Sequence, residues 1–325
     1  MTRVIRVHAY GGPEVLQVED IQVGSPGAGE VKLRQTAIGL NYFDVYARTG
    51  LYPQSAMPFI PGAEGAGIVT EIGQGVTGLK PGDRVAYAVS TGGYAEERLI
   101  AADRLVPLPA GIDDRAAAAM MLKGMTVEYL INRTFKVGPT TTLLFHAAAG
   151  GVGLMACQWA RELGATIIGT VGSPEKAELA KAHGATHTIN LRTENFVARV
   201  REITNGKLCD VAYDSIGKDT YMGSLDCLKP RGLLVAFGQS SGAIPPFNVA
   251  ILNQKGSLYV TRPSLGAYTS NREELLATAR SLFAMVTAGK VKIEVKQTYP
   301  LSRAADAHRD LEARKTTGST LLLPG

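Results

Sequence analysis

The chain has 325 residues, of which 45% are hydrophobic and 19% are charged, and its formal net charge is +5. This length allows two domains with buried cores, and the composition is that of a globular protein. No apolar run reaches the roughly 18 residues that a membrane-spanning helix requires. The basic residues are scattered, which favours a solvated surface and a pocket for an anionic cofactor over nucleic acid as the main partner.

The cysteines and the N-terminal segment bear on where the protein works. Cys157, Cys209 and Cys227 are far apart and form no Cys-x-x-Cys pair. This spacing argues against a disulfide framework and against a structural zinc lobe. The segment Met1–Arg6 lacks the apolar core of a secretory signal. We therefore expect a cytoplasmic protein that does not bind a membrane.

Short segments with the pattern of β-strands fill the first 122 residues. Turn residues such as Pro26-Gly27 separate these segments. The spacing predicts an all-β, barrel-like domain. The expected strands are Arg3–Tyr10, Leu16–Val23, Val31–Leu40, Gly65–Ile72, Arg84–Val89 and Ala95–Ala101.

From about residue 123 the pattern changes to alternating strands and helices, which is typical of a parallel sheet. Six strands are expected, at Thr142–Ala147, Thr166–Val171, His187–Asn190, Asp210–Ser215, Leu233–Gly238 and Ser257–Arg262. This is the strand count of a doubly wound dinucleotide-binding (Rossmann) domain, which we assign to residues 123–262.

The last segment, residues 263–325, continues after that sheet is complete. Its expected elements are a helix Arg272–Thr287, a strand Ile293–Tyr299, a helix Arg303–Arg314 and a strand Thr320–Leu323. We expect this segment to return to the first domain, which then comprises residues 1–122 and 263–325. The cleft between the two domains is the expected active site.

A turn rich in small residues, Phe145–Gly153, joins the first strand of the predicted Rossmann domain to a helix over Leu154–Leu163. The pattern is Ala147-x-x-Gly150-x-x-Gly153, so alanine replaces the first glycine of the usual fingerprint. Backbone N–H groups at such a helix start bind a pyrophosphate, and glycine allows the close approach. The strand and helix that this motif requires are both expected, so Gly150, Gly151, Val152 and Gly153 are predicted to bind a dinucleotide.

The end of the next strand indicates which dinucleotide binds. NAD enzymes place a carboxylate there, on the ribose 2′-hydroxyl. Here the strand ends in Gly172 and Ser173, Pro174 opens the next helix, and Lys176 lies in its first turn. Room at Gly172, a helix start capped by Ser173 and a nearby lysine suit a 2′-phosphate, although Glu175 would repel it unless its side chain points outward. These features favour NADPH over NADH.

Several segments together resemble the medium-chain dehydrogenase/reductase superfamily, and more closely its zinc-independent quinone oxidoreductase, or zeta-crystallin-like, branch. They are Gly39–Pro53, Pro61–Gly67, Leu122–Thr126, His146–Gly153, Tyr259–Leu265 and Gly318–Pro324. The resemblance implies an α/β fold with a GroES-like, β-barrel-type catalytic domain beside the six-stranded Rossmann domain. It also implies a homodimer, and strand Ser257–Arg262, at the expected edge of the sheet, is the predicted interface.

The resemblance also shows which metal ligands are missing. Zinc alcohol dehydrogenases have a cysteine ligand where this chain has Asn41, and a histidine ligand where it has Ala63. An amide and a methyl group are not the ligands that zinc prefers, so no metal site is expected. Without a Lewis acid to activate an alcohol, the expected acceptors are molecules that are already electron-poor.

The site residues follow from the resemblance. Asn41 and Tyr46 are expected to line the nicotinamide and substrate side, and Tyr52 is a second candidate there; these three are the catalytic candidates, supplied by one loop. A phenol or an amide can hydrogen-bond a developing oxyanion. The implied cofactor contacts are Lys123 and Thr126 at the start of a helix between the domains, Ser215, Phe237, Gly238 and Ser240 after two strands, and Arg314 toward the 2′-phosphate. Leu191 stands where many relatives have a tyrosine, which removes one phosphate contact.

Three functions remain open from the sequence. The first is an NADPH-dependent quinone oxidoreductase, and the second is an enone or 2-enoyl-thioester reductase on the same scaffold. Both require the same hydride donor and the same candidate residues, so the sequence separates them poorly. The third is a nucleotide-sensing or RNA-binding protein, which predicts salt-dependent RNA affinity and no oxidation of NADPH.

Overall fold

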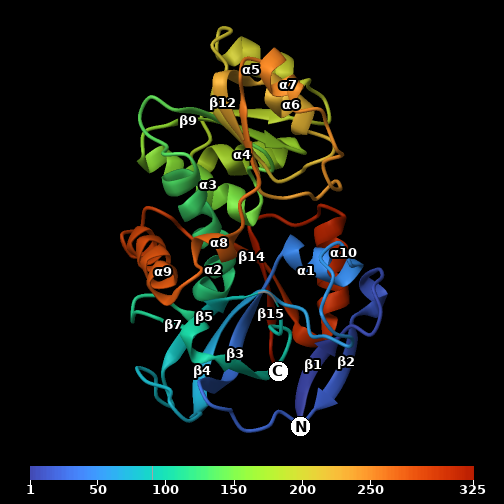
Figure 1. Cartoon of the computed structure of the whole chain (residues 1–325), viewed down its shortest axis with the longest axis vertical. Helices are drawn as coiled ribbons and strands as arrows, with labels where there is room; N and C mark the ends of the chain where they lie inside the picture. Colours follow the sequence, from blue (N-terminus) through green and yellow to red (C-terminus); the bar gives the residue numbers. More distant parts are fainter. Residues whose placement is uncertain (90) are drawn as a thin grey trace. The chain divides into compact units, whose positions relative to one another are not determined.

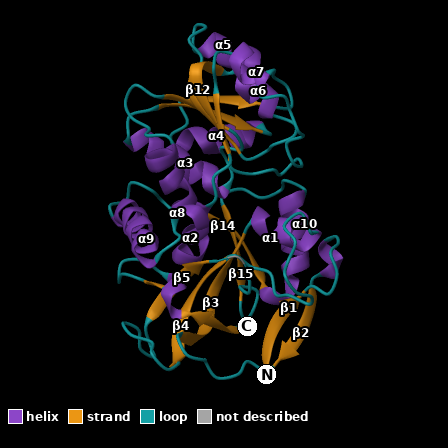
Figure 2. Cartoon of the chain, in the orientation of Figure 1, coloured by secondary structure: helices purple, strands orange, loops and turns teal. Residues whose placement is uncertain are grey.

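The computed structural model describes residues 1–89 and 91–325 and shows two compact units. Unit 1 comprises Met1–Met125, Thr269–Thr287 and Ile293–Gly325, and unit 2 comprises Thr126–Tyr268 and Ala288–Lys292. Helix α2 (Asp114–Tyr129) carries the chain from the first unit into the second. Figure 1 follows the chain by colour from blue to red, and Figure 2 separates helices from strands.

Unit 2 is built on one parallel sheet. Its strands are β8 (Thr142–Phe145), β9 (Thr166–Val171), β10 (His187–Asn190), β11 (Cys209–Asp214), β12 (Leu228–Ala236) and β13 (Tyr259–Thr261). Their spatial order is β10-β9-β8-β11-β12-β13, and every neighbouring pair is parallel. This is the doubly wound order, in which the direction of winding reverses at the first strand, so the prediction of a six-stranded Rossmann sheet is confirmed.

The remaining elements of unit 2 connect these strands. They are the π-helical turn η3 (Leu130–Thr134) and the helices α3 (Gly151–Glu162), α4 (Pro174–Ala182), α5 (Phe196–Ile203), α6 (Tyr221–Asp226), α7 (Ala250–Gln254) and α8 (Leu265–Tyr268). The strands have apolar runs because helices cover them; Leu144, Ile168 and Ala212 are completely buried beside Val200 of α5. This core fixes the carboxyl ends of the strands, where ligands of such folds bind.

Unit 1 is built on mainly antiparallel strands, with one parallel pair formed by its last two strands, and it has a few helices. Its strands are β1 (Thr2–Arg6), β2 (Gln17–Ile21), β3 (Glu30–Leu40), β4 (Glu64–Ile72), β5 (Arg84–Ala88), β6 (Glu97–Ala101), β7 (Val106–Pro107), β14 (Val295–Pro300) and β15 (Ser319–Leu323). Its helices are α1 (Tyr42–Thr49), α9 (Arg272–Thr287) and α10 (Ala304–Glu312), with short turns η1 (Pro13–Val15), η2 (Ala102–Arg104) and η4 (Leu301–Arg303).

Strand β3 organises unit 1, because its two halves have different partners. Its first half pairs with β6 on one side, its second half pairs with β15, and β4 runs along most of its length. The main path of the sheet is β14-β15-β3-β4-β5-β7, while β1 and β2 form a separate hairpin. The C-terminal strands therefore belong to the same sheet as β3, whose last residue, Leu40, leads directly into α1.

The main departure from the predicted elements is helix α1, which occupies a segment expected to be a loop. Its signals are local: the Asp44 carboxylate accepts a hydrogen bond from the Asn41 backbone N–H at 2.8 Å, and Gly50 ends the helix with a φ of 80°. The predicted strand Arg3–Tyr10 is also wrong at its end, since β1 stops at Arg6.

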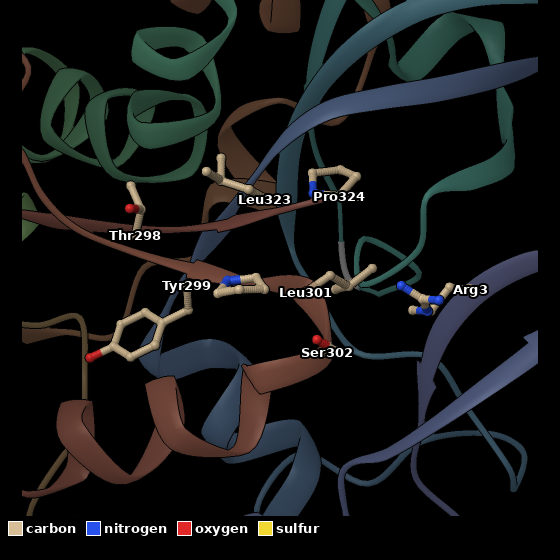
Figure 3. A pocket seen from close by; sticks show the side chains of 9 residues that line it. Arg3, Thr298, Tyr299, Leu301, Ser302, Leu323 and Pro324 are labelled. Carbon is tan, nitrogen blue, oxygen red and sulfur yellow. The ribbon is translucent and has the colours of Figure 1, made fainter.

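A small hollow of about 240 Å³ lies where the chain ends in unit 1 (Figure 3). Its walls come from the end of β14, from η4 and from the last residues, and Arg3 is the one charged side chain among its described lining residues. Its described lining residues include no acidic side chain that could pair with Arg3, so they offer no acid–base pair for catalysis. Of the helices within residues 1–89 and 91–325, none is both long enough and apolar enough to cross a bilayer.

Candidate active site

Helix α1 and the residues that flank it carry the three predicted catalytic residues, of which Tyr46 and Tyr52 are in contact. Asn41 precedes its first turn, Tyr46 lies on its inner face, and the Tyr52 backbone N–H donates to the Tyr46 carbonyl at 3.0 Å. The Tyr46 and Tyr52 rings pack edge to face with centroids 5.2 Å apart. Tyr46 is buried and helical, so the expectation that one loop supplies all three residues is wrong for Tyr46.

Asn41 belongs to a cluster of buried polar side chains. Its amide Nδ2 donates to Glu64 Oε1 at 2.8 Å, and the Lys123 ammonium donates to the same oxygen. The other oxygen, Glu64 Oε2, accepts from the Leu122 backbone N–H at 2.7 Å. Because a carboxylate only accepts, these contacts fix the Asn41 amide with its nitrogen toward Glu64. Lys123 lies in the second half of α2, so the expectation that Lys123 and Thr126 begin this helix is wrong.

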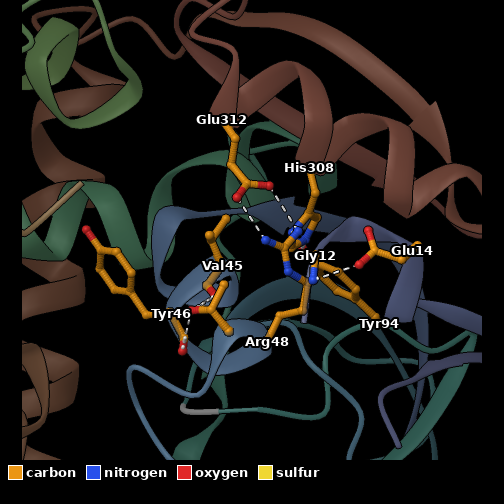
Figure 4. Close-up of polar contacts among 9 residues, drawn as sticks. Gly12, Glu14, Val45, Tyr46, Arg48, Tyr94, His308 and Glu312 are labelled. Carbon is orange, nitrogen blue, oxygen red and sulfur yellow. Dashed lines mark hydrogen bonds and ion pairs between the residues drawn. The ribbon is translucent and has the colours of Figure 1, made fainter. Parts of the chain in front are cut away.

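A second chain of contacts leads from Asp44 to the helix α10, and Figure 4 shows the members Tyr94, His308, Arg48 and Glu312. The Tyr94 hydroxyl donates to Asp44 Oδ2 at 3.0 Å and lies 2.9 Å from His308 Nε2. Since its single proton goes to Asp44, the hydroxyl must accept from His308 Nε2–H. His308 Nδ1 then accepts from Arg48 Nη1 at 3.4 Å. These contacts assign one tautomer to His308.

Burial determines which side chains in this chain of contacts carry a charge. It lowers the pKa of His308 to about 3, with help from the positive charge of Arg48, so the ring is neutral at physiological pH. Arg48 is held by a bidentate pair with Glu312, at 2.8 and 3.0 Å. Arg48 is thereby engaged inside the protein, and in Figure 4 the Tyr46 ring extends from α1 away from it. Arg48 is therefore not available to clamp a substrate carboxylate.

Asp44 is a buried carboxyl group whose ionisation is unfavourable. Burial raises its pKa to about 7, against the opposing effects of the Asn41 and Tyr94 hydrogen bonds and of Lys123. Its Oδ1 atom is buried without a hydrogen-bond partner among the described residues, while Oδ2 accepts two hydrogen bonds. A proton on Oδ1 leaves both accepted bonds intact, which is why the neutral form fits this position.

The glycine-rich turn in unit 2 follows β8 directly. Ala147 has a φ of 56°, a left-handed conformation that glycine adopts without strain, which explains why the usual fingerprint has glycine there. A Cβ on Gly153 would lie 2.5 Å from the Ala147 carbonyl oxygen. The turn therefore leaves no space for a side chain at Gly153, as a backbone cradle for a pyrophosphate requires. Gly151 and Val152 form the first turn of α3.

The end of β9 also has the geometry that the sequence predicts. The Ser173 side chain accepts from the Lys176 backbone N–H at 3.3 Å, with Pro174 at the start of α4. A Cβ on Gly172 would have open space around it. The pKa of Glu175 is lowered by its hydrogen bond with Ser173, which draws that carboxylate onto the helix start. No carboxylate ends β9 itself, where NAD enzymes have one.

The remaining predicted cofactor residues lie at chain turns. Ser215 follows β11, and Phe237, Gly238 and Ser240 follow β12, so all four are at the carboxyl edge of the unit 2 sheet. A Cβ on Gly238 would lie 2.6 Å from the Ser215 carbonyl oxygen. Thr126 is the first residue of unit 2, Leu191 follows β10, and Arg314 follows α10 in unit 1.

His146 directly follows β8 within the fingerprint and is completely buried. Its Nε2 lies 2.9 Å from Ser224 Oγ, which donates to Asp214 Oδ2 at 2.9 Å. Burial lowers the pKa of His146. The serine lies between the histidine and the carboxylate, so these residues lack the order of a nucleophilic triad, in which the histidine is central, and they serve packing.

The two positions of missing zinc ligands hold groups that do not bind zinc. Asn41 is bound to Glu64, and Ala63 is a buried methyl group. Within residues 1–89 and 91–325 no three His, Cys, Asp or Glu side chains form a group that could hold a metal ion. The residues present do not fit a zinc ion.

Comparisons with known proteins agree with both units. Residues 27–110 match the alcohol dehydrogenase GroES-like domain, and residues 151–280 match the zinc-binding dehydrogenase model. The chain is 54% identical to a quinone oxidoreductase of Pseudomonas aeruginosa, with 100% of each chain covered. It is 47% identical to a 2-haloacrylate reductase of a Burkholderia species, with 98% of each covered. The structure of Escherichia coli quinone oxidoreductase complexed with NADPH superposes with a TM-score of 0.98 at 51% identity, covering 100% of each chain.

The chain therefore belongs to the medium-chain dehydrogenase/reductase superfamily, and within it to the branch of zinc-independent quinone oxidoreductases. The predicted family and the predicted fold class are both confirmed. Glu64, Tyr94 and His308 were missed by the sequence analysis. Glu64 lies inside the segment Pro61–Gly67 that carried the resemblance, so its charge between apolar neighbours was an available signal.

Proposed function

We propose that the protein is an NADPH-dependent quinone oxidoreductase that uses no metal. The observation that carries this proposal is the full-length likeness to quinone oxidoreductases, at 54% and 51% identity, one of them solved with NADPH. The glycine-rich turn and the end of β9 supply the matching local chemistry. Residues 123–262 are the proposed NADP-binding domain, and residues 1–122 and 263–325 are the proposed catalytic domain.

The cofactor contacts are proposed in three groups. The N–H groups of Gly150, Gly151, Val152 and Gly153 bind the pyrophosphate at the start of α3. Gly172, Ser173, Lys176 and Arg314 accommodate the 2′-phosphate. The other contacts toward the nucleoside and nicotinamide are Asn41, Lys123, Thr126, Ser215, Phe237, Gly238 and Ser240.

Bound NADPH supplies a hydride, and the chain's own residues orient the acceptor. Asn41, Tyr46 and Tyr52 are the proposed substrate residues, because an amide and two phenols can hydrogen-bond a carbonyl and the rings can stack on a planar molecule. Arg48 is bound to Glu312, which is unfavourable for hydroxy-acid substrates.

The test is an acceptor panel with oxidation of NADPH and of NADH as the readout. We expect saturable turnover of benzoquinones or naphthoquinones, with NADPH preferred. Dialysis against a strong chelator should leave turnover unchanged. Stoichiometric zinc in active protein, with activity lost on its removal, or a preference for NADH would contradict the proposal.

A second candidate, reduction of an electron-poor carbon–carbon double bond, is favoured by the likeness to 2-haloacrylate reductase at 47% identity. The same panel therefore includes an enone, a 2-haloacrylate and a 2-enoyl thioester. Saturable activity on one of these, with none on any quinone, would replace the first function by the second. Salt-dependent RNA affinity without NADPH oxidation would contradict both.

We also propose a cytoplasmic homodimer. Its support is β13, the edge strand of the unit 2 sheet, where Tyr259 is 61% exposed. The three cysteines are free thiols, as expected in a reducing compartment. Sedimentation should give a dimer, and Val260→Pro should give monomers or aggregates. A native monomer at micromolar concentration would exclude the dimer.

A further inference from the structure

The carboxylate of Glu64 is the centre of a donor cluster that the proposed function leaves unexplained. It lies at the start of β4, is 0% exposed, and accepts from the Asn41 amide, the Lys123 ammonium and the Leu122 backbone N–H. Each partner is a donor, so a protonated Glu64 would have no acceptor for its own hydrogen. These contacts therefore require an ionised carboxylate.

The two side-chain donors of this cluster lie side by side, because both bind the same oxygen, Glu64 Oε1. An ammonium has three N–H groups and an amide has two, so each nitrogen has hydrogens left after binding Glu64. In the described part of the chain, neither nitrogen has a second hydrogen-bond partner. Lys123 is 6% and Asn41 8% exposed, whereas Glu64 is 0% exposed, so the cluster is buried but its two side-chain donors belong to the residues that are not completely enclosed.

A purely structural role does not require these residue types. A buried ion pair is costly to desolvate, and a well-packed apolar pair often gives equal or greater stability at such a position. An apolar pair could also join β4 to α2. It could not present a positive charge and an amide N–H, held in place by a common acceptor, to a bound molecule.

We propose that Lys123 and Asn41, both held by the Glu64 carboxylate, bind the carbonyl oxygen of the electron acceptor and stabilise the negative charge that develops on it. Lys123 is then a further catalytic residue and Glu64 a positioning residue. This inference rests on the proposed function. A hydride brings two electrons and one proton to the acceptor, the carbonyl π bond becomes a lone pair on oxygen, and a solvent proton later neutralises it. A fixed ammonium stabilises that oxyanion without reorganisation.

The principal test replaces the ion pair by a neutral pair, in the double variant Glu64→Gln/Lys123→Met. We expect a folded protein, and a fluorescence titration gives the NADPH concentration that saturates each variant, so that turnover is compared at saturating NADPH. Quinone kcat/KM should fall about 10²- to 10³-fold, the usual loss when an oxyanion donor is removed. Lys32→Met is the matched control, because it removes a surface lysine bound to Glu71 at 3.3 Å, and it should change none of these values.

A second measurement follows the ionisation of a bound phenol and does not depend on turnover. The probe is 4-nitrophenol, whose absorbance reports its ionisation, titrated with pH in protein saturated with NADP+. In wild type the cluster should favour the phenolate, so that half-ionisation occurs at a proton concentration at least 10-fold higher than in solution. In Lys123→Met this shift should disappear.

The single variant Glu64→Gln supplies a third readout, the dependence of kcat/KM on pH. Without its counter-ion, the Lys123 ammonium loses its proton more readily, so kcat/KM should gain a decline at alkaline pH that wild type lacks. A merely structural pair would not move the pH profile.

Two results would overturn the inference: kcat/KM within 3-fold of wild type in the double variant, or an unchanged probe titration in Lys123→Met. If wild type reduces no quinone but shifts the probe, and Lys123→Met abolishes that shift, the quinone function fails while the oxyanion site is supported.

Discussion

The candidate sites of the two units consist of different kinds of chemical group. In unit 2 the proposed ligand-binding groups are backbone N–H groups in a turn where a side chain at Gly153 would collide with the Ala147 carbonyl. In unit 1 they are buried charged and polar side chains, from Asn41 and Glu64 to His308. A backbone cradle depends on the absence of side chains, whereas a side-chain network depends on protonation states. The two sites should therefore respond to different perturbations.

The largest expected effect is on the network of unit 1. Folded Asp44 holds its proton up to about pH 7, whereas an unfolded aspartate releases it near its usual pKa of 3.8. Between these pH values the folded state binds more protons, so the free energy of unfolding falls as pH rises. The fall attributable to Asp44 is about 4 kcal/mol, and Asp44→Asn should remove it. Urea unfolding at pH 4 to 8 measures the difference.

The control for this prediction is Asp306→Asn, an exposed aspartate whose pKa is lowered by Arg303. That variant should keep the fall in stability between pH 4 and 7. If wild type and Asp44→Asn have parallel pH profiles, Asp44 ionises normally and the network does not depend on its proton.

The next effect tests the cradle of unit 2. Gly153→Ala places a Cβ 2.5 Å from the Ala147 carbonyl, while Gly150→Ala places one at 3.3 Å from the same oxygen. Overpacking of this kind costs about 1–3 kcal/mol, so Gly153→Ala should weaken NADPH binding about 10- to 100-fold. Gly150→Ala should weaken it less than about 3-fold. Equal losses in a fluorescence titration would show that close packing does not shape the site.

We expect the choice of cofactor to depend on the charge of Lys176, in the first turn of α4. Lys176→Ala should raise KM for NADPH about 10-fold, equivalent to one charge-assisted contact, and leave KM for NADH unchanged. Lys181→Ala, which removes a surface lysine paired with Glu178 in the same helix, is the control. An equal rise for both cofactors would place Lys176 away from the 2′-phosphate.

The smallest expected effect is the loss of quinone turnover when Tyr46, which packs edge to face with Tyr52, loses its hydroxyl group. Tyr46→Phe should lower quinone turnover less than about 10-fold, because one hydrogen bond is worth about 1 kcal/mol. A fall of about 10³-fold would assign Tyr46 an obligatory proton-donor role and favour the enone reductase. The comparison is made at constant NADPH saturation, so that binding and turnover are separated.

A contrast between local patterns and long-range contacts also determines which features could be predicted from the sequence. The individual strands of unit 2, the turn over Phe145–Gly153 and the Ser173 cap are specified by residues close together in the chain, and all are confirmed. Helix α1 was missed, although Asp44 and Gly50 are local signals. The contacts of Asp44 with Tyr94, and of Tyr94 with His308, join positions 50 and 214 residues apart. No local pattern specifies such pairings, because they arise only after β3 and its partners have assembled.

The way in which unit 1 is divided along the chain also determines when it can fold. Unit 2 is nearly continuous, from Thr126 to Tyr268, so most of its contacts are available once that stretch has been synthesised. In unit 1, β3 pairs with β15 and Arg48 binds Glu312. Residues 1–125 therefore cannot complete their contacts until these later residues have been synthesised. Long-range pairing of this kind is slow, and it leaves the edge of β3 uncovered during translation. Unit 1 therefore completes its sheet only after unit 2, which lies between its two parts along the chain, has been synthesised.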